Sequence, residues 1–222
     1  MMEIKTEIQP TADGSTTLYR SDIDEHYHSV KGAVAESRHV YIGSALEHRM
    51  TKGFSGGLTV LEIGFGTGLN AAMSVEAATD KCHITYVSLE LYPLPPHITG
   101  SLGYSCHAPY IAAVNDAPWD IAIDITPRFT LHKRLADFNS CTLPEGVDVV
   151  YFDAFAPEKQ PEMWSADGFR RLFEAMNPGG VLTTYCAKGT VRRSLRDTGF
   201  DVERIAGPPG GKREILRCTK PL

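Results

Sequence analysis

The sequence has few features of an exported, disulfide-bonded or metal-dependent protein. Its longest apolar runs are only as long as a strand, which excludes a membrane-spanning helix. The first ten residues, MMEIKTEIQP, carry acidic side chains and no apolar stretch, so they do not form a secretory signal. Five cysteines are scattered among 222 residues without any C-x-x-C pair. Neither a disulfide framework nor a zinc site is therefore expected, and the reducing cytoplasm is the expected location.

Positive charge is also scarce, with 22 Lys and Arg against 27 Asp and Glu, a net charge of −5. This balance argues against a general nucleic-acid-binding protein. The charge is unevenly distributed, because residues 184–222 hold nine basic and four acidic residues. That basic end could bind a polyanion, although solvated helix and strand faces would give the same count. His26 and His28 have strand spacing but no third ligand in pattern, so we expect no metal site.

Hydrophobic periodicity predicts an α/β fold. We expect strands at 58–64, 83–90, 129–133, 147–154, 180–187, 200–207 and 212–218, and helices at 69–79, 165–177 and 188–199. Several of these strands are apolar on both faces, which indicates a mostly parallel sheet with helices on both sides. The last two strands are joined too tightly for a crossover, so they should form an antiparallel hairpin.

Two segments are less regular than the rest. Residues 1–52 are polar and mixed, with one short apolar alternation at His39–Ile42. We expect them to form a small N-terminal extension of short strands and turns, before an α/β domain at 53–222. Residues 91–128 are interrupted by prolines, and one or two helices are expected there, around the tyrosines and the DAPWDIAID stretch. Ser165 is the expected N-cap of the helix that follows it.

The stretch VLEIGFGTGLN, between a predicted strand and helix, is typical of a ligand-binding glycine loop. Glycines let the backbone approach a ligand where a Cβ atom would clash, and the helix N-terminus offers free N–H groups. Leu69 stands where the dinucleotide fingerprint requires its third glycine. The E-x-G-x-G-x-G pattern is instead the form seen in S-adenosylmethionine-dependent methyltransferases, with a tight turn that binds nothing as the alternative. The expected cofactor-binding residues of this loop are Glu62, Gly64, Gly66, Thr67, Gly68 and Asn70.

Acidic residues follow the next two strands. Glu90 ends the strand at 83–90, where it can accept hydrogen bonds from both ribose hydroxyls of a nucleotide-like cofactor. Asp137 follows the third strand and can accept a hydrogen bond from an adenine amino group. Ala136 or Phe138 would then supply N–H donors and apolar cover. A solvated loop aspartate is an equally good interpretation of Asp137.

The strand at 147–154 ends at Asp153 and continues into the stiff, aromatic-rich loop FAPEKQPEMW. A carboxylate there lies beside the expected methionine end of the cofactor, where it can orient an amine and accept its proton. Asp153 is therefore the expected catalytic residue and also a cofactor contact. Phe155 could flank the methyl group or a base. The alternative for Asp153 is a structural N-cap or loop acid.

Several segments resemble the methyltransferase domain of the MnmC-type tRNA-modifying proteins. They are LEIGFGTGLN, YFDAFAPEKQPEMW, NPGG, VRRSLRDTGF and GKREIL, in the order found in that family, and HYHSVKGAVAESRHVYIGSAL before them. The resemblance covers nearly the whole chain and is weakest over 91–128. It departs at Ala154, where the bifunctional relatives tend to have glycine.

The resemblance implies a Rossmann-like S-adenosylmethionine-dependent methyltransferase that acts on tRNA. Its implied substrate is the primary amine of 5-aminomethyl-2-thiouridine at the wobble position. The chain resembles the stand-alone, MnmD-like form without the FAD-dependent domain, so a separate enzyme is expected to make the aminomethyl precursor. Three alternatives stay open: an aminopropyltransferase of the spermidine-synthase type, a small-molecule amine methyltransferase of the same fold, and a non-catalytic S-adenosylmethionine-binding module.

Further residues are candidates for substrate contact. Tyr27, Ser29, Glu36 and Ser37 could close the N-terminal segment over the cofactor or base, or could be ordinary turn residues. Lys159 and Trp164 could contact RNA phosphate or stack on a base, although such a Lys is more often solvated and such a Trp more often part of the core. The expected contacts to the tRNA backbone are Arg192, Arg193, Lys212 and Arg213. Arg213 could instead pair with Glu214.

Overall fold

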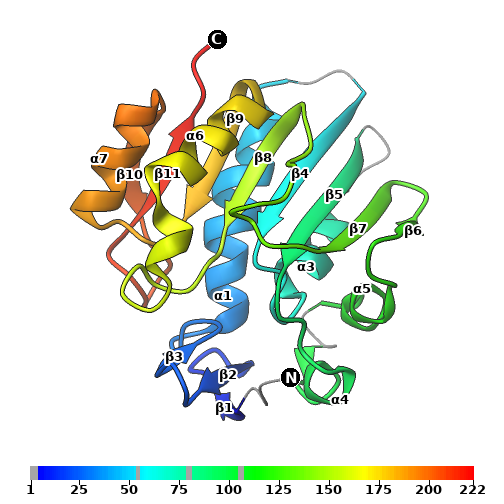
Figure 1. Ribbon diagram of the computed structural model, residues 1–222. Coiled ribbons are helices and arrows are strands. Elements are labelled where there is room, and N and C mark those ends of the chain that lie inside the picture. Colours follow the sequence, from blue (N-terminus) through cyan, green and yellow to red (C-terminus); the bar gives the residue numbers. More distant parts are fainter. Residues whose placement is uncertain (1–4, 54–55, 79–81, 105–107) are drawn as a thin grey trace.

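The computed structural model describes residues 5–53, 56–78, 82–104 and 108–222. An eight-stranded sheet forms its centre (Figure 1). In spatial order the strands are β10 (Asp201–Ala206), β11 (Glu214–Thr219), β9 (Met176–Thr184), β8 (Val147–Phe152), β4 (Gly57–Ile63), β5 (His83–Glu90), β7 (Phe129–Leu135) and β6 (Ala122–Thr126). The five strands from β9 to β7 are parallel, and β10 and β11 form an antiparallel hairpin. The predicted α/β fold, mostly parallel sheet and C-terminal hairpin are confirmed.

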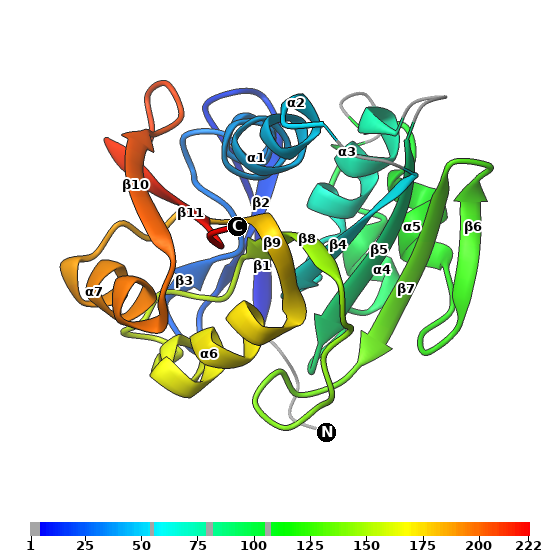
Figure 2. The ribbon, with the colours of Figure 1, turned by 90° about the horizontal axis from the view of Figure 1, so that it is seen from above.

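Helices cover both faces of this sheet, as Figures 1 and 2 show. One face packs against α3 (Leu69–Ala77), α5 (Ile111–Asp116) and a helical segment near the N-terminus. The other packs against α6 (Ala166–Ala175) and α7 (Gly189–Thr198). Successive strand residues alternate between the two hydrophobic clusters; on β8, for example, Tyr151 enters the first and Phe152 the second. This two-sided burial explains why β8 is apolar at nearly every position.

The expectation of short strands and turns holds only for the first part of the N-terminal region. A small antiparallel sheet contains β1 (Thr6–Pro10), β2 (Thr16–Arg20) and β3 (Glu25–His26). Residues 33–51 are instead continuously helical, in α1 (Ala33–Ser37), η1 (Arg38–Glu47), which has π-helical hydrogen bonding, and α2 (His48–Thr51).

The prediction for residues 33–51 was wrong because the apolar alternation at His39–Ile42 is only four residues long. Such a short stretch cannot distinguish the two-residue period of a strand from the period of a helix. Tyr41, Ile42, Ala45 and Leu46 recur every three or four residues and are all buried in the core shared with the sheet. The proposed division of the chain at residue 52 stays a prediction.

Residues 91–128 contain both helix and strand. Among the described residues of this segment, α4 (Pro96–Thr99) and the predicted helix near the tyrosines, α5, are α-helical. The DAPWDIAID stretch was wrongly expected to be helical, because its isoleucines alternate with other residues, and Ala122–Thr126 pairs with β7 as the edge strand β6. Ser165 is confirmed as the N-cap of α6, since its Oγ accepts a hydrogen bond from the Gly168 N–H at 3.1 Å.

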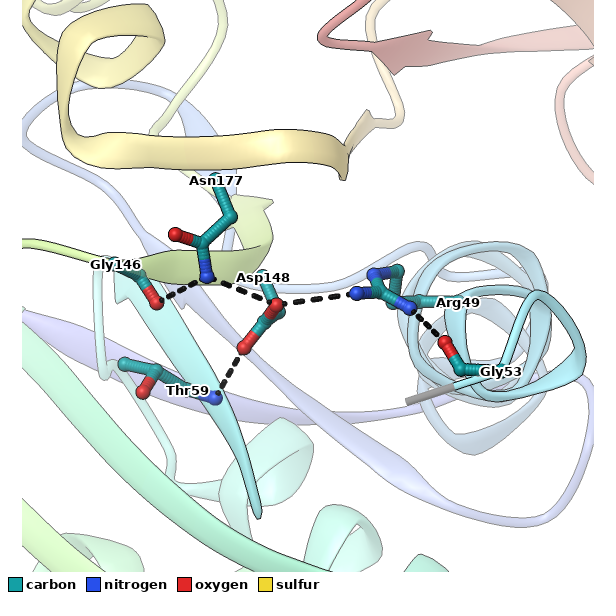
Figure 3. Close-up of polar contacts among 6 residues, drawn as sticks. All are labelled: Arg49, Gly53, Thr59, Gly146, Asp148 and Asn177. Atoms are coloured by element: carbon teal, nitrogen blue, oxygen red, sulfur yellow. Dashed lines mark hydrogen bonds and ion pairs between the residues drawn. The ribbon is translucent and has the colours of Figure 1, made fainter. Parts of the chain in front are cut away.

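A polar network ties the N-terminal helix to the sheet at the end opposite Asp153 (Figure 3). Asp148, near the start of β8, accepts hydrogen bonds from the Thr59 N–H at 3.0 Å and from Asn177 Nδ2 at 3.1 Å. Its third partner is Arg49 from α2, at 3.3 Å. The network therefore fixes how the helix lies against β4, β8 and β9.

No helix in the described ranges is long and apolar enough to cross a membrane.

Candidate active site

A cavity of about 540 Å³ lies at the carboxyl ends of β4, β5, β7 and β8, beneath the hairpin of β2 and β3. Its size is that of a small-molecule site, and its place is the usual ligand position of open α/β sheets. Many residues singled out in the sequence line it: Tyr27, Ser29, Glu36, Gly64, Gly66, Thr67, Glu90, Ala136, Asp137, Phe138, Asp153, Phe155 and Lys212. The structure thus brings side chains from the two ends and the middle of the chain to one place.

The glycine loop forms one wall of this cavity. Gly64 has φ +92°, and a Cβ atom there would lie 3.0 Å from the backbone oxygen of Asp153. Gly66 has φ +51°, and a Cβ atom there would lie 3.1 Å from the Tyr27 ring. Both positions therefore need glycine, for conformation and for space. Gly68 lies behind the wall, where its N–H donates to the Phe65 carbonyl at 2.9 Å.

Glu90 faces the cavity with its carboxylate held by the backbone. The Gly66 N–H donates to Oε2 at 3.0 Å, and the Tyr92 N–H donates to Oε1 at 2.9 Å. Each oxygen keeps a further lone pair, so the group can still accept two hydrogen bonds from a ligand. The Ala136 N–H is already bonded to the Glu90 carbonyl at 3.0 Å. Asp137 Oδ1 accepts the Asn139 N–H at 2.9 Å.

Asp153 follows the last residue of β8 and has hydrogen bonds to both carboxylate oxygens. The Tyr41 hydroxyl donates to Oδ1 at 2.6 Å, and Asn70 Nδ2 donates to Oδ2 at 2.8 Å. Burial raises the pKa of Asp153 to about 7, and the negative charge of Glu36 adds to the rise, whereas the hydrogen bonds and Lys212 oppose it. The carboxyl group is therefore poised between its two protonation states near neutral pH.

A second acid and a lysine lie in the same part of the cavity. Glu36 is buried, accepts the Ser29 N–H at 2.7 Å, and has its pKa raised by burial. Lys212, from the turn between β10 and β11, places Nζ 3.5 Å from the centroid of the Tyr185 ring. Desolvation lowers the pKa of Lys212, while Glu36 opposes that shift. This end of the cavity is thus built to hold cationic groups against carboxylates and an aromatic face.

The N-terminal hairpin covers the cavity through specific contacts. Tyr27 packs edge-on against the Phe155 ring, with centroids 5.0 Å apart. His28 Nε2 lies 2.8 Å from the Thr67 hydroxyl of the glycine loop, and burial lowers the pKa of His28 to about 4, so it is neutral. Lys159 pairs with Asp24 of the hairpin at 3.5 Å. Lys159 therefore lies beside the N-terminal hairpin and not on the cavity wall.

Several residues that complete the site were not predicted from the sequence. Arg20 places its guanidinium 5.7 Å from the centroid of the Phe155 ring, and Glu25 and Tyr185 line the cavity. Tyr41, which holds Asp153, comes from the helical segment that was not predicted. Only Tyr185 had a usable signal, because it directly follows β9 at the sheet edge where ligands bind.

Other predicted site residues lie away from the cavity wall. Trp164 is packed in the core against Phe152, and its Nε1 donates to the Phe155 carbonyl at 2.8 Å, so it supports the loop. Ser37 is fully buried. Glu62 and Asn70 are buried behind Asp153.

Apart from Lys212, the basic candidates lie away from the cavity, and Arg192 is half-buried while Arg193 is exposed. Arg192 and Arg193 lie on α7, and Arg213 is exposed on the turn before β11. Glu214 pairs with Arg204 at 3.3 Å and not with Arg213. Among the residues that the structure describes, no three His, Cys, Asp or Glu side chains are grouped so as to hold a metal ion.

Comparisons with known proteins point to one kind of enzyme. A family of S-adenosyl-L-methionine-dependent methyltransferases matches residues 122–221. The tRNA 5-methylaminomethyl-2-thiouridine biosynthesis bifunctional protein MnmC of Cupriavidus necator is 31% identical over 93% of this chain. MnmC of Pseudoalteromonas atlantica is 32% identical over 97% of it. The alignments cover 33% and 34% of those proteins, so the chain spans about a third of the length of these curated relatives.

Solved structures agree with the sequence relatives. MNMC2 of Aquifex aeolicus superposes with a TM-score of 0.78 at 26% identity, covering 98% of this chain and 71% of that one. A spermidine synthase of Thermotoga maritima shares the fold, with a TM-score of 0.66 at 14% identity over 99% of this chain and 70% of that one. The expected Rossmann-like fold and resemblance to MnmC are confirmed. The matched family, the relatives and the shared fold together identify this chain as an S-adenosyl-L-methionine-dependent methyltransferase.

Proposed function

We propose that this protein methylates the primary amine of 5-aminomethyl-2-thiouridine at the tRNA wobble position, giving 5-methylaminomethyl-2-thiouridine. The observation that carries the proposal is Asp153, a strand-end carboxylate in the cavity with a pKa near 7. Similarity to the MnmC proteins, whose name specifies this nucleoside, supports the choice of substrate. The aminomethyl precursor would come from a separate reaction.

The cavity residues suit S-adenosylmethionine. Gly64 and Gly66 line the cavity with backbone that carries no side chain, which suits close approach of the cofactor's methionine end. Glu90 keeps free lone pairs on both oxygens, which suits the two ribose hydroxyls. Asp137 and its neighbours Ala136 and Phe138 also line the cavity, and Asp137 is the proposed contact for the adenine amino group. The bound cofactor supplies an electrophilic methyl group on a sulfonium.

The acidic end of the cavity suits the amine. A primary aliphatic amine is mostly protonated near neutral pH and must lose a proton before its nitrogen can attack. Glu36 and Asp153 together attract the ammonium ion, and ionised Asp153 accepts its proton. With a pKa near 7, about half of the Asp153 population is ionised at neutral pH, which suits a general base working there. Tyr41 and Asn70 keep both oxygens in a fixed orientation.

The basic C-terminal part would bind the tRNA backbone. Lys212 lies at the cavity and Arg213 follows it on the same turn, while Arg192 and Arg193 lie on α7. Phosphate contacts from these side chains would carry most of the affinity and make it dependent on salt. Phe155, on the cavity wall, is the proposed contact for the base.

Aminopropyl transfer is the competing reaction, because the acidic cavity would also suit a polyamine. The shared fold with a spermidine synthase shows the fold alone. The two reactions are separated by incubating the protein with methyl-labelled S-adenosylmethionine and tRNA from cells blocked at the final methylation. A parallel reaction contains decarboxylated S-adenosylmethionine and putrescine. We expect label in the wobble nucleoside and no aminopropylated product; label in a small amine, or aminopropyl transfer, would reject the proposal.

A further inference from the structure

The glutamate of the glycine loop is buried behind the cavity wall. Glu62 is fully buried, and it is not among the residues that line the cavity. In the sheet register its neighbours are Ser88 on β5 and Tyr151 on β8. Its side chain therefore lies on the face covered by α3, where Tyr86 of β5 is also buried. A direct contact between Glu62 and a ligand in the cavity does not fit this position.

Three polar atoms around Glu62 lack hydrogen-bond partners among the described residues. Ser88 Oγ donates to Glu62 Oε2 at 2.7 Å, but Glu62 Oε1, Asn70 Oδ1 and the Tyr86 hydroxyl are buried and unpartnered. Buried polar atoms are nearly always paired, so three orphans in one cluster require an explanation. An ionised Glu62 could not bond to Asn70 Oδ1, because both atoms would be acceptors. A neutral Glu62 could donate its O–H to that oxygen.

Asn70 connects Glu62 to the catalytic carboxylate. Its Nδ2 donates to Asp153 Oδ2 at 2.8 Å, so this one amide lies between the two acids. Burial raises the pKa of Glu62 to about 8 and the charge of Asp153 adds to the rise, whereas the neighbouring Ser88, Asn70 and Tyr86 side chains, which can donate to the carboxylate, oppose it. The other titratable groups facing Glu62 are Tyr86 and Tyr151, and burial raises the pKa of both, so they stay neutral.

We propose that Glu62 is a positioning residue that acts on Asp153 through Asn70. As a neutral acid, Glu62 donates to Asn70 Oδ1 and keeps the amide turned so that Nδ2 faces Asp153. An ionised Glu62 would compete for that N–H and place a second negative charge behind the base. This role rests on the proposed function of Asp153 in methyl transfer, and it replaces the expected contact between Glu62 and the cofactor.

The protonation of Glu62 can be measured without any substrate. Infrared difference spectra of the free wild-type protein and Glu62→Gln at pH about 7.5 should show a protonated-carboxyl C=O band that only the wild type has. Asp153→Asn is the matched control, recorded at pH about 6 because loss of the Asp153 charge lowers the pKa of Glu62; it removes the neighbouring acid and should leave the band. Absence of the band would overturn the proposal, whether or not the protein methylates tRNA. A band without methyl transfer to tRNA would instead refute the proposed function.

The coupling through Asn70 is tested by a double-mutant cycle. Glu62→Leu should lower kcat about tenfold and move the acidic limb of the pH profile, while Glu62→Gln, which keeps a donor, should recover most of the loss. In an Asn70→Ala background, Glu62→Leu should add less than about twofold. Cofactor affinity, measured by calorimetry, should stay within about threefold and also reports folding. Additive losses, or a Glu62→Gln variant that mainly loses cofactor affinity, would contradict the role.

Discussion

Replacing Tyr41 with phenylalanine removes one of the two hydrogen bonds that hold the Asp153 carboxylate. The Tyr41 hydroxyl donates to Asp153 Oδ1 at 2.6 Å, and its ring packs on Tyr151 with centroids 5.3 Å apart. Phenylalanine keeps the ring and its packing, so the change is confined to the hydrogen bond. The bond stabilises the ionised form of Asp153, and its loss should raise the pKa of that group.

The size of the shift follows from the strength of a hydrogen bond to a charged group. Such bonds contribute about 1.5–3 kcal/mol, and one pKa unit corresponds to about 1.4 kcal/mol. The pKa of Asp153 should therefore rise from about 7 by about one to two units. Because the ionised form accepts the proton, and about half of Asp153 is ionised at pH 7 in the wild type, methyl transfer at pH 7 should fall about five- to fiftyfold. Most of the rate should return at higher pH.

The assay is methyl transfer from labelled S-adenosylmethionine to undermethylated tRNA, measured as kcat/KM between pH about 6 and 10. Tyr104→Phe is a suitable control, because it removes another buried hydroxyl, which donates to the Thr16 carbonyl at 2.7 Å. The control should lose some stability while its acidic limb stays in place. A Tyr41→Phe profile with an unmoved limb would refute the assignment of that limb to Asp153.

Three further predictions concern stability and RNA binding. Asp148→Ala should cost about 3 kcal/mol in denaturant unfolding, because it leaves a largely buried arginine unpaired, while the acidic limb should stay in place. The raised pKa values of Asp153 and Glu62 make stability fall as pH rises from about 4.5 to 7, because the folded groups keep protons that the unfolded chain releases, while the lowered pKa of His28 opposes this fall. Glu62→Gln should therefore make stability fall less with rising pH than in the wild type, measured in thermal unfolding scans. Replacing Arg192 and Arg193 with alanine should weaken tRNA binding and lower its salt dependence by about one to two phosphate contacts, with cofactor affinity kept in calorimetry.

The fold was predictable where the sequence repeats a long, clear period. The strand at Val147–Phe152 is buried at every position, and its apolar run could be read in only one way. The segment at His39–Ile42 was wrongly predicted to be extended, because four residues cannot distinguish the two-residue period of a strand from the period of a helix. Only the longer spacing from Tyr41 to Leu46 shows the buried side of the helix.

The candidate site was predictable where its residues end strands. Gly64, Glu90 and Asp153 each follow or end a parallel strand, and the carboxyl ends of such strands meet at one edge. Tyr41 reaches the same region from a helical segment far away in sequence. No local pattern indicates such contacts, because they depend on how that segment packs against the sheet.

The most direct measurement of the central claim is the turnover of Asp153→Asn with undermethylated tRNA, set against its cofactor affinity. Asparagine keeps the size of the side chain and cannot accept the proton of the amine. Asp153→Asn should bind S-adenosylmethionine within about threefold of the wild type, while turnover should fall at least about a hundredfold. Turnover within about fivefold of the wild type would contradict the role of Asp153 as the base.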